Sequence, residues 1–117
     1  MNRDQLFLLK PDFMAGAQGP CYCPACATLE GVLTFYPQLR VVLDIHYVDF
    51  PRPRVAVIEA VGAENQGLPL LLIAPDPSAE LALAGLDVRE WQSRRFLRSA
   101  GDMGRYLARR HGIGEPH

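Results

Sequence analysis

The sequence predicts a single α/β domain with a four-stranded mixed sheet and helices on both faces. Three observations support this prediction. Apolar segments with the period of a strand alternate along the chain with segments of helical period. The run from Leu70 to Ala74 is continuously apolar, as expected for a central strand covered on both sides. Two cysteines, Cys23 and Cys26, stand at the start of a helical pattern, and no repeat or linker divides the 117 residues.

Four segments have the composition or period of strands. The segment from Val41 to Val48 alternates apolar and polar side chains, which predicts a strand with one well-buried face. Between the first two strands, the segment from Pro11 to Pro20 is expected to be a loop, because Pro, Gly and Ala occur throughout it. The four expected strands are residues 5–9, 41–48, 70–74 and 91–97.

Four segments have helical spacing. Pro24 suits the first helical position, because its missing N–H has no intrahelical partner there, and Pro37 stops that helix. Gly62 is expected to end the second helix. Ser99 is expected to cap the last helix, with Asp102 three residues further on. The expected helices are residues 24–36, about 54–61, 79–84 and 100–110.

The order of these elements predicts the sheet topology. Strands joined through a helix are expected to be parallel neighbours with a right-handed crossover. The last two strands have no long helix between them and are expected to pair antiparallel. The predicted sheet is therefore mixed.

Composition and charge exclude several classes of protein. The net charge of −1 gives no overall field that would attract nucleic acid or an anionic membrane surface. The apolar run from Leu68 to Ala74 is far too short to span a bilayer, and the apolar stretch from Leu6 to Leu9 is too short for the core of a signal peptide. A cytoplasmic location is therefore expected. The three cysteines lie within six positions, which does not indicate a structural disulfide framework. In a reducing compartment, such cysteines are more often catalytic or metal-binding.

The two cysteines at the helix start are the candidate catalytic residues. Unpaired backbone N–H groups and the positive end of the helix dipole stabilise a thiolate at Cys23. Cys26, one turn inside the helix, is placed to close a disulfide onto Cys23. Because a lone Cys-x-x-Cys is a weak motif, the alternative that these are structural thiols stays open.

Cys21 has three possible roles. It is a third redox partner, an inert loop thiol, or a metal ligand together with Cys23 and Cys26. A zinc or iron–sulfur site needs a fourth ligand, and only three cysteines are grouped here. His46, the only mid-chain histidine, lies on an expected strand, where its ring is more often satisfied by hydrogen bonds or solvent-facing. We therefore expect no bound metal.

With this order of elements, the chain resembles the thioredoxin/glutaredoxin superfamily along nearly its whole length. The stretch Cys23-Pro24-Ala25-Cys26 is similar to the active-site motif of that superfamily in its glutaredoxin form. Leu68-Pro69 resembles the dipeptide whose cis-proline faces that motif. The resemblance implies a thioredoxin-like fold, a nucleophilic Cys23, a resolving Cys26 and a cis peptide bond before the proline.

A closer resemblance is to a small bacterial family of uncharacterised thioredoxin-like proteins, known only as a domain of unknown function. It implies a fold but no established activity. The stretches that resemble this family are Leu6-Phe7-Leu8-Leu9-Lys10-Pro11, Cys23-Pro24-Ala25-Cys26, Leu29-Glu30-Gly31, Phe50-Pro51-Arg52-Pro53-Arg54, Glu64-Asn65-Gln66-Gly67-Leu68-Pro69 and Tyr106-Leu107-Ala108.

Two features depart from the better-known superfamily members. Twelve residues separate Lys10 from Cys23, which is a longer first loop than the compact pattern has. Tyr22 stands before the motif, where thioredoxins have tryptophan. Both features argue against a thioredoxin-type role in reducing proteins.

The expected substrate-binding residues are Leu68, Pro69 and Tyr22. Leu68 would offer its backbone to an extended thiol peptide such as glutathione, by strand addition. Proline at a strand start is sterically permitted in any case, so Pro69 also has a purely structural explanation.

Three basic residues are candidates for the carboxylates of such a peptide. Lys10, Arg52 and Arg54 would each reach a substrate carboxylate or, alternatively, would simply be solvated.

The sequence thus predicts a glutaredoxin-like thiol–disulfide oxidoreductase. Its expected partner is a thiol or disulfide substrate, either glutathione or a protein. No cofactor is expected, although glutathione is a candidate co-substrate, and neither nucleic acid nor a membrane is an expected partner. The alternatives are a non-catalytic binding module on the same fold and a Cys-ligated metal-binding protein.

Overall fold

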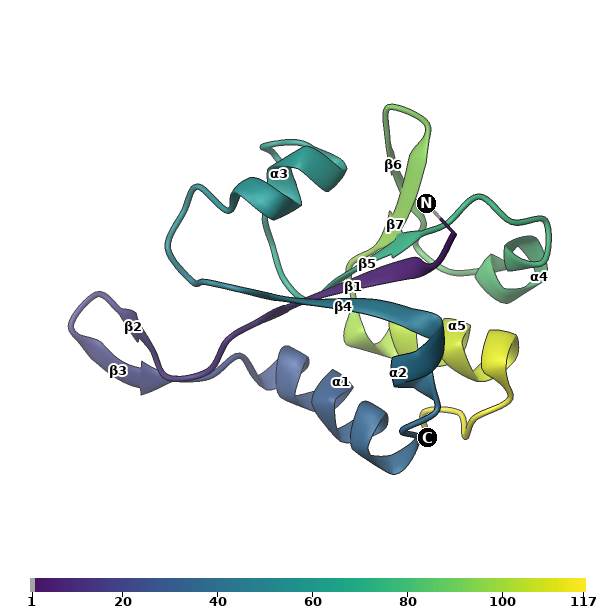
Figure 1. Ribbon diagram of the computed structural model, residues 1–117, viewed down its shortest axis with the longest axis horizontal. Coiled ribbons are helices and arrows are strands. Elements are labelled where there is room, and N and C mark those ends of the chain that lie inside the picture. Colours follow the sequence, from purple (N-terminus) through teal and green to yellow (C-terminus); the bar gives the residue numbers. More distant parts are fainter. Residues whose placement is uncertain (1) are drawn as a thin grey trace.

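In the computed structural model, which describes residues 2–117, one mixed sheet lies between two sets of helices (Figure 1). The sheet has five strands in the order β4-β1-β5-β7-β6. β1 pairs parallel with β4 and antiparallel with β5, and the remaining pairs are antiparallel. The strands are β1 (Asp4–Leu9), β4 (Leu43–Val48), β5 (Leu70–Ile73), β6 (Arg89–Trp91) and β7 (Arg94–Leu97).

The side chains of β1 point alternately into two separate cores, one on each face of the sheet. Leu6 and Leu8 pack in a core that contains residues of α1, α2, α4 and α5, whereas Phe7 packs against α3. Figure 1 shows α1, α2 and α5 below the sheet and α3 above it. Helices on both faces, as predicted, are therefore confirmed. The helices are α1 (Pro24–Phe35), α2 (Leu39–Val42), α3 (Val55–Val61), α4 (Ala79–Leu83) and α5 (Ala100–His111).

A buried carboxylate fixes the first strand to the last helix. Asp4 is 4% exposed and accepts hydrogen bonds from the backbone N–H of Ala74 at 2.7 Å and from the Tyr106 hydroxyl at 2.5 Å. Burial, together with the hydrogen bond to Asp4, raises the pKa of Tyr106 far above its usual range. Both polar groups are thus satisfied in the core, where an unpaired one would be costly.

Two predictions about the sheet were wrong. The strands β4 and β5, which α3 joins, are neither neighbours nor parallel, because β1 lies between them and pairs antiparallel with β5. The sheet also has five strands and not four, because residues 91–97 do not form one strand. They belong to the hairpin β6–β7, which turns at Gln92 and Ser93 with φ of 48° and 66°. Positive φ at two adjacent positions is typical of tight hairpin turns, but these turns are usually formed by Asn and Gly. The antiparallel pairing of β5 with β7 was predicted correctly.

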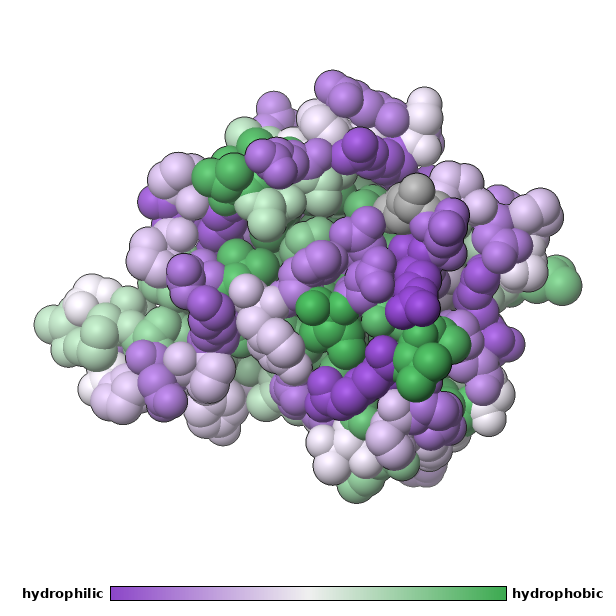
Figure 2. Space-filling model, viewed as in Figure 1, coloured by the Kyte–Doolittle hydropathy of each residue, from purple (hydrophilic) through white to green (hydrophobic). Residues whose placement is uncertain are grey.

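The expected loop 11–20 is instead a second, two-stranded sheet of β2 (Phe13–Ala15) and β3 (Gln18–Cys21). This hairpin projects from the body of the molecule (Figure 1) and carries apolar residues along its length (Figure 2). At its base, Phe13 stacks on Phe50, with 4.2 Å between the ring centroids.

The expected strand 41–48 is a strand only in its second part. Val41 and Val42 are exposed and belong to α2, and β4 begins at Leu43. β4 is an edge strand, and Tyr47 on it is exposed, so the predicted well-buried face is only partly buried.

The predicted helix ends agree with the structure. α1 begins at Pro24, α3 ends at a Gly62 cap, and the Ser99 side chain accepts the hydrogen bond that caps α5. The expected helix 79–84 is α4. Within residues 2–117, no helix has both the length and the apolar character needed to cross a membrane.

Candidate functional site

Cys23 is the N-cap of α1. Its backbone is extended, with φ of −82° and ψ of 114°, and its Sγ accepts a hydrogen bond from the backbone N–H of Cys26 at 3.2 Å. Its carbonyl accepts the first helical bond, from Ala27 at 2.9 Å. The first turn of α1 contains no acidic residue. The positive end of the helix dipole is therefore directed at a sulfur atom, with no carboxylate of that turn to neutralise it.

Cys26 lies on the inner side of the same turn. It is 3% exposed, and its Sγ accepts a hydrogen bond from the backbone N–H of Leu9 at 3.4 Å. Burial, followed by the hydrogen bond with Cys23, raises the pKa of the Cys26 thiol to about 12. The two thiols thus differ in kind: Cys23 is partly exposed at the helix end, and Cys26 is buried and stays protonated at neutral pH.

Leu68 and Pro69 lie beside these thiols, as the superfamily resemblance implies. The Cys23 thiol donates to the Leu68 carbonyl at 3.9 Å, across 45 positions of the chain. The Leu68–Pro69 peptide bond is cis, and Pro69 is buried just before β5. The structure therefore places the predicted backbone contact next to the candidate nucleophile.

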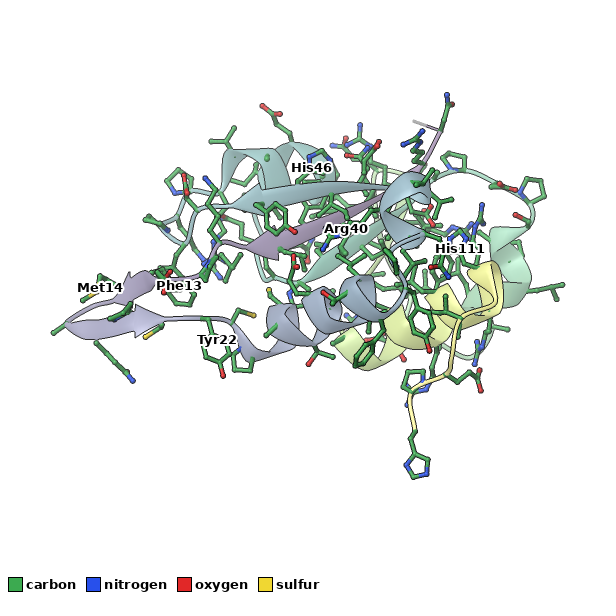
Figure 3. All side chains as sticks on the ribbon, turned by 60° about the horizontal axis from the view of Figure 1, so that its bottom comes forward. Phe13, Met14, Tyr22, Arg40, His46 and His111 are labelled. Carbon is green, nitrogen blue, oxygen red and sulfur yellow. The ribbon has the colours of Figure 1, made fainter. Side chains whose placement is uncertain are left out.

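A groove of about 450 Å³ opens over the two sulfurs. Tyr22 lies between the hairpin and the start of α1 (Figure 3), and 65% of its surface is exposed. It lines this groove together with both cysteines, as predicted for a substrate-binding residue. The lining is largely apolar and also includes hydroxyl and carboxylate groups. The lining residues are Leu9, Pro11, Tyr22, Cys23, Cys26, Ala27, Glu30 and Tyr47.

Two residues that line the groove, Glu30 and Tyr47, form a polar cluster with Arg40. Glu30, one turn after Cys26, accepts a hydrogen bond from the Tyr47 hydroxyl and another from Arg40 at 3.4 Å. Burial, and then the hydrogen bond to Glu30, raises the pKa of Tyr47. The Glu30 carboxylate therefore already has two partners. Glu30 was not among the site residues predicted from the sequence.

Arg54 is neither solvated nor available to a substrate carboxylate, so both interpretations offered for it from the sequence were wrong. It is only 7% exposed. Its Nε and Nη2 donate to the Phe50 carbonyl at 2.9 and 2.7 Å, and its Nη1 donates to the Gln66 carbonyl at 2.8 Å. Its guanidinium carbon lies 5.3 Å from the centroid of the Phe50 ring.

The other two basic candidates lie on the surface. Lys10 forms an exposed ion pair with Asp49 at 3.0 Å, and Arg52 is exposed. Neither lines the groove over the thiols.

Cys21 does not join the other two cysteines in a metal-binding arrangement. Its thiol lies on the hairpin, 3.7 Å from the Gln18 carbonyl. Across residues 2–117, no three His, Cys, Asp or Glu side chains are grouped as metal ligands. His46 also stands apart: it shares a 2.9 Å hydrogen bond with Gln5 and stacks on Phe7. His46 is thus the satisfied strand histidine that the sequence favoured.

Sequence reasoning missed the burial of Arg54 because no local pattern indicates it. Arg54 follows Pro53 and directly precedes α3, a position that is usually solvated. A possible signal was Gln66, whose side-chain oxygen accepts from the Arg54 backbone N–H at 2.8 Å. The pairing spans 12 positions, however, and no periodicity connects them.

These features define an α/β protein with a Cys-x-x-Cys motif at a helix N-terminus, beside a proline-led strand. The chain belongs to a family described as "Protein of unknown function (DUF3088)", whose family model matches residues 3–115. No match was found among curated proteins or among solved structures.

Proposed function

We propose that this chain is a thiol–disulfide oxidoreductase of glutaredoxin-like character, with Cys23 as the nucleophile and Cys26 as the resolving thiol. We also propose that its fold is thioredoxin-like. The four strands β4-β1-β5-β7, with one parallel and two antiparallel pairings, support the fold assignment.

The asymmetry of the two thiols is the observation that carries the proposal. Cys23 lies at a helix N-terminus and on a groove, where a thiolate is both stabilised and accessible. Cys26 is buried, and its raised pKa keeps it protonated until a reaction partner is attached to Cys23. A purely structural pair has no need of this difference.

The proposed reaction proceeds in two exchanges. The Cys23 thiolate attacks one sulfur of a disulfide, that S–S bond breaks, and the departing thiolate takes up a proton. Cys26 then loses its proton and attacks Cys23 of the mixed disulfide. This second step releases the other half of the substrate as a thiol and leaves a Cys23–Cys26 disulfide. The substrate gains two electrons, and the protein loses two.

The neighbouring backbone suits an extended thiol peptide such as glutathione. The Leu68 carbonyl lies 3.9 Å from the Cys23 sulfur, so a peptide linked to Cys23 would pass this backbone and pair with it. Tyr22 would cover the peptide from the outer side of the groove, where its ring is exposed.

An exchange assay with single-cysteine variants tests the proposal. We expect the wild type to reduce a mixed disulfide of glutathione and a small thiol, with reduced glutathione as the electron source. Cys23→Ser should lose the activity completely, yet stay folded, because serine is a good N-cap. Cys21→Ser, the matched control two residues away, should keep the wild-type rate.

Other results would contradict the proposal. Wild-type protein without exchange activity towards either glutathione or peptide disulfides would favour the non-catalytic binding module. A Cys23→Ser variant as active as the wild type would exclude Cys23 as the nucleophile.

A further inference from the structure

We propose that Arg54 supplies the counter-charge of the Cys23 thiolate and thereby favours the dithiol form of the protein over its disulfide form. This inference rests on the proposed function and deepens it, because it assigns a direction of electron flow. A pair whose reduced form is stabilised oxidises its partner. The proposed exchange is reversible, and its equilibrium would then favour the reverse direction, in which a substrate dithiol is oxidised and the protein disulfide is reduced.

Arg54 is a buried charge without a carboxylate partner in the part of the chain that the structure describes. Arg54 is 7% exposed, and among residues 2–117 none of its contacts is a salt bridge to a carboxylate. Its hydrogen-bond partners are the neutral carbonyls of Phe50 and Gln66. Burying a cation without an anion is costly, so a nearby group that can become negative lowers the energy of this arrangement.

Arg54 and Cys23 contact the same stretch of backbone before β5. Arg54 donates to the Gln66 carbonyl at 2.8 Å, and Cys23 contacts the Leu68 carbonyl at 3.9 Å. Both side chains are therefore anchored on the same short backbone segment, two residues apart. Burial and the charge of Arg52 lower the pKa of Arg54, and ionised Cys26 or Cys23 would act in the opposite direction. The guanidinium is thus within electrostatic reach of both sulfurs.

Among the groups considered as the counter-charge of Arg54, only Cys23 is both free of other ionic partners and able to become negative at neutral pH. Cys26 cannot become negative at neutral pH, because burial raises its pKa to about 12. Glu30 already accepts hydrogen bonds from Arg40 and Tyr47. Cys23 remains, and its Sγ also accepts the Cys26 backbone N–H.

The two tyrosines that line the groove do not change the assignment of the negative charge to Cys23. Tyr22 is exposed to solvent, and burial raises the pKa of the Tyr47 phenol, so that Tyr47 carries no negative charge at physiological pH. The helix dipole and Arg54 therefore both favour the negative charge on Cys23.

The redox consequence follows from the charge balance. In the dithiol form, the charge of the Cys23 thiolate balances that of Arg54. In the Cys23–Cys26 disulfide, both sulfurs are neutral and Arg54 is a buried cation without a counter-ion. Reduction of this disulfide takes up two electrons and, because Cys23 stays ionised, one proton. A substrate dithiol supplies the two electrons, becomes a disulfide and releases two protons, one of which goes to Cys26.

The experiment equilibrates the full chain with reduced and oxidised glutathione and measures the dithiol fraction after acid quenching. We expect Arg54→Gln to shift the equilibrium constant at least about tenfold towards the disulfide, a change of about 30 mV for this two-electron couple. Glutamine keeps an N–H donor for the carbonyls but removes the charge. Arg54→Lys, which keeps the charge, should lie within about threefold of the wild type, and the exposed neighbour variant Arg52→Gln should leave the constant unchanged.

A purely structural role for Arg54 predicts a different outcome. In that case Arg54→Gln would lower the stability of the dithiol and disulfide forms equally and leave the glutathione equilibrium within about twofold of the wild type. That result, with wild-type protein that does exchange disulfides, overturns this inference alone. Wild-type protein that exchanges no disulfides overturns the proposed function instead.

A wild-type measurement keeps the proposal falsifiable if Arg54→Gln does not fold. Reduction of the protein disulfide by glutathione releases one proton when Cys23 is ionised and none when it is protonated. The equilibrium constant should therefore rise with pH, up to about tenfold per pH unit, over the range below the pKa of glutathione itself. A constant that does not change with pH over this range would overturn the proposal.

Discussion

The two long helices of this protein begin with the same geometry and different atoms. α1 and α5 are each 12 residues long, and each is capped by a side chain that accepts the backbone N–H three residues ahead. In α5 the acceptor is the Ser99 oxygen, 3.0 Å from the Asp102 nitrogen. In α1 it is the Cys23 sulfur, 3.2 Å from the Cys26 nitrogen. A hydroxyl caps well and does not ionise at neutral pH, whereas a thiol caps weakly and can ionise.

The two helices also differ in the charged residues at their ends. α5 has Asp102 in its first turn and Arg109, Arg110 and His111 in its last turn, so both ends of its dipole are compensated. α1 has no acidic residue in its first turn and no basic residue in its last turn. The difference indicates that α5 is optimised for stability, while the positive end of α1 is left for a charge that exists only when Cys23 is ionised.

Of the changes that test this difference between the two helices, adding a carboxylate to the first turn of α1 should have the largest effect, and it should act on the reactivity of Cys23. Ala25→Asp places a negative charge in the first turn, beside Cys23, so the thiolate would form only at higher pH. We expect alkylation of Cys23 at neutral pH to slow by about threefold to tenfold, which is the size of a typical helix-dipole or single-charge effect. Rates measured by mass spectrometry for the isosteric neutral variant Ala25→Asn provide the control. Equal rates in both variants would mean that the helix end does not activate the thiol.

The residue three positions after the N-cap of α1 should make the stability of the protein depend on pH. Cys26 occupies this position in α1, and its folded pKa of about 12 lies above the ordinary value of 9.0. The unfolded chain therefore loses the Cys26 proton at lower pH than the folded chain does. Stability from this group is complete below about pH 9 and is lost as the pH rises towards 12, by up to about 1.4 kcal/mol per pH unit.

Urea unfolding of the reduced protein at about pH 8 and pH 10 measures this effect. The wild type should lose more stability over this interval than Cys26→Ala does, because the variant lacks the titrating group. Tyr106 and Tyr47, whose pKa values are also raised, are present in both proteins and cancel in the difference. An identical pH dependence in the two proteins would show that Cys26 ionises in the folded chain as it does in the unfolded one.

Removing the caps themselves should have the smallest effect. Ser99→Ala should lower the free energy of unfolding by about 1 kcal/mol, equivalent to about 4 °C in Tm for a chain of this size. At a pH low enough for the Cys23 thiol to be protonated, Cys23→Ser should change it by no more than about 0.5 kcal/mol, because serine provides a cap of equal or better quality and no thiolate is lost. Thermal unfolding followed by circular dichroism compares the two. If Cys23→Ser were as destabilising as Ser99→Ala, the thiol would have a structural importance that the comparison denies.

The parts of the fold that local chemistry determines could be predicted from the sequence. Pro24 begins α1, and Ser99 caps α5, because each satisfies backbone groups within its own turn. The uninterrupted apolar run of β5 indicated a central strand, and its four residues are buried. The same local reasoning located the cysteine pair at a helix end.

The errors occurred where distant contacts decide the structure. Val41 and Val42 have strand propensity, but they form a helical turn before the edge strand β4. Gln92 and Ser93 adopt positive φ without the Asn or Gly that normally signals a hairpin. Arg54 is buried because Phe50 and Gln66 supply carbonyls, and the Gln66 contact spans 12 positions. No local pattern carries this information.

The central claim is that Cys23 is an activated thiol and Cys26 is a protected one. The rate of alkylation of each cysteine against pH, resolved by mass spectrometry on the reduced wild type, tests this claim most directly. We predict that Cys23 is alkylated faster at neutral pH than an ordinary thiol, as activated thiols at helix N-termini are, while Cys26 stays unreactive to about pH 10. A Cys23 rate that follows an ordinary thiol, with its midpoint near ~8.5, would contradict the account.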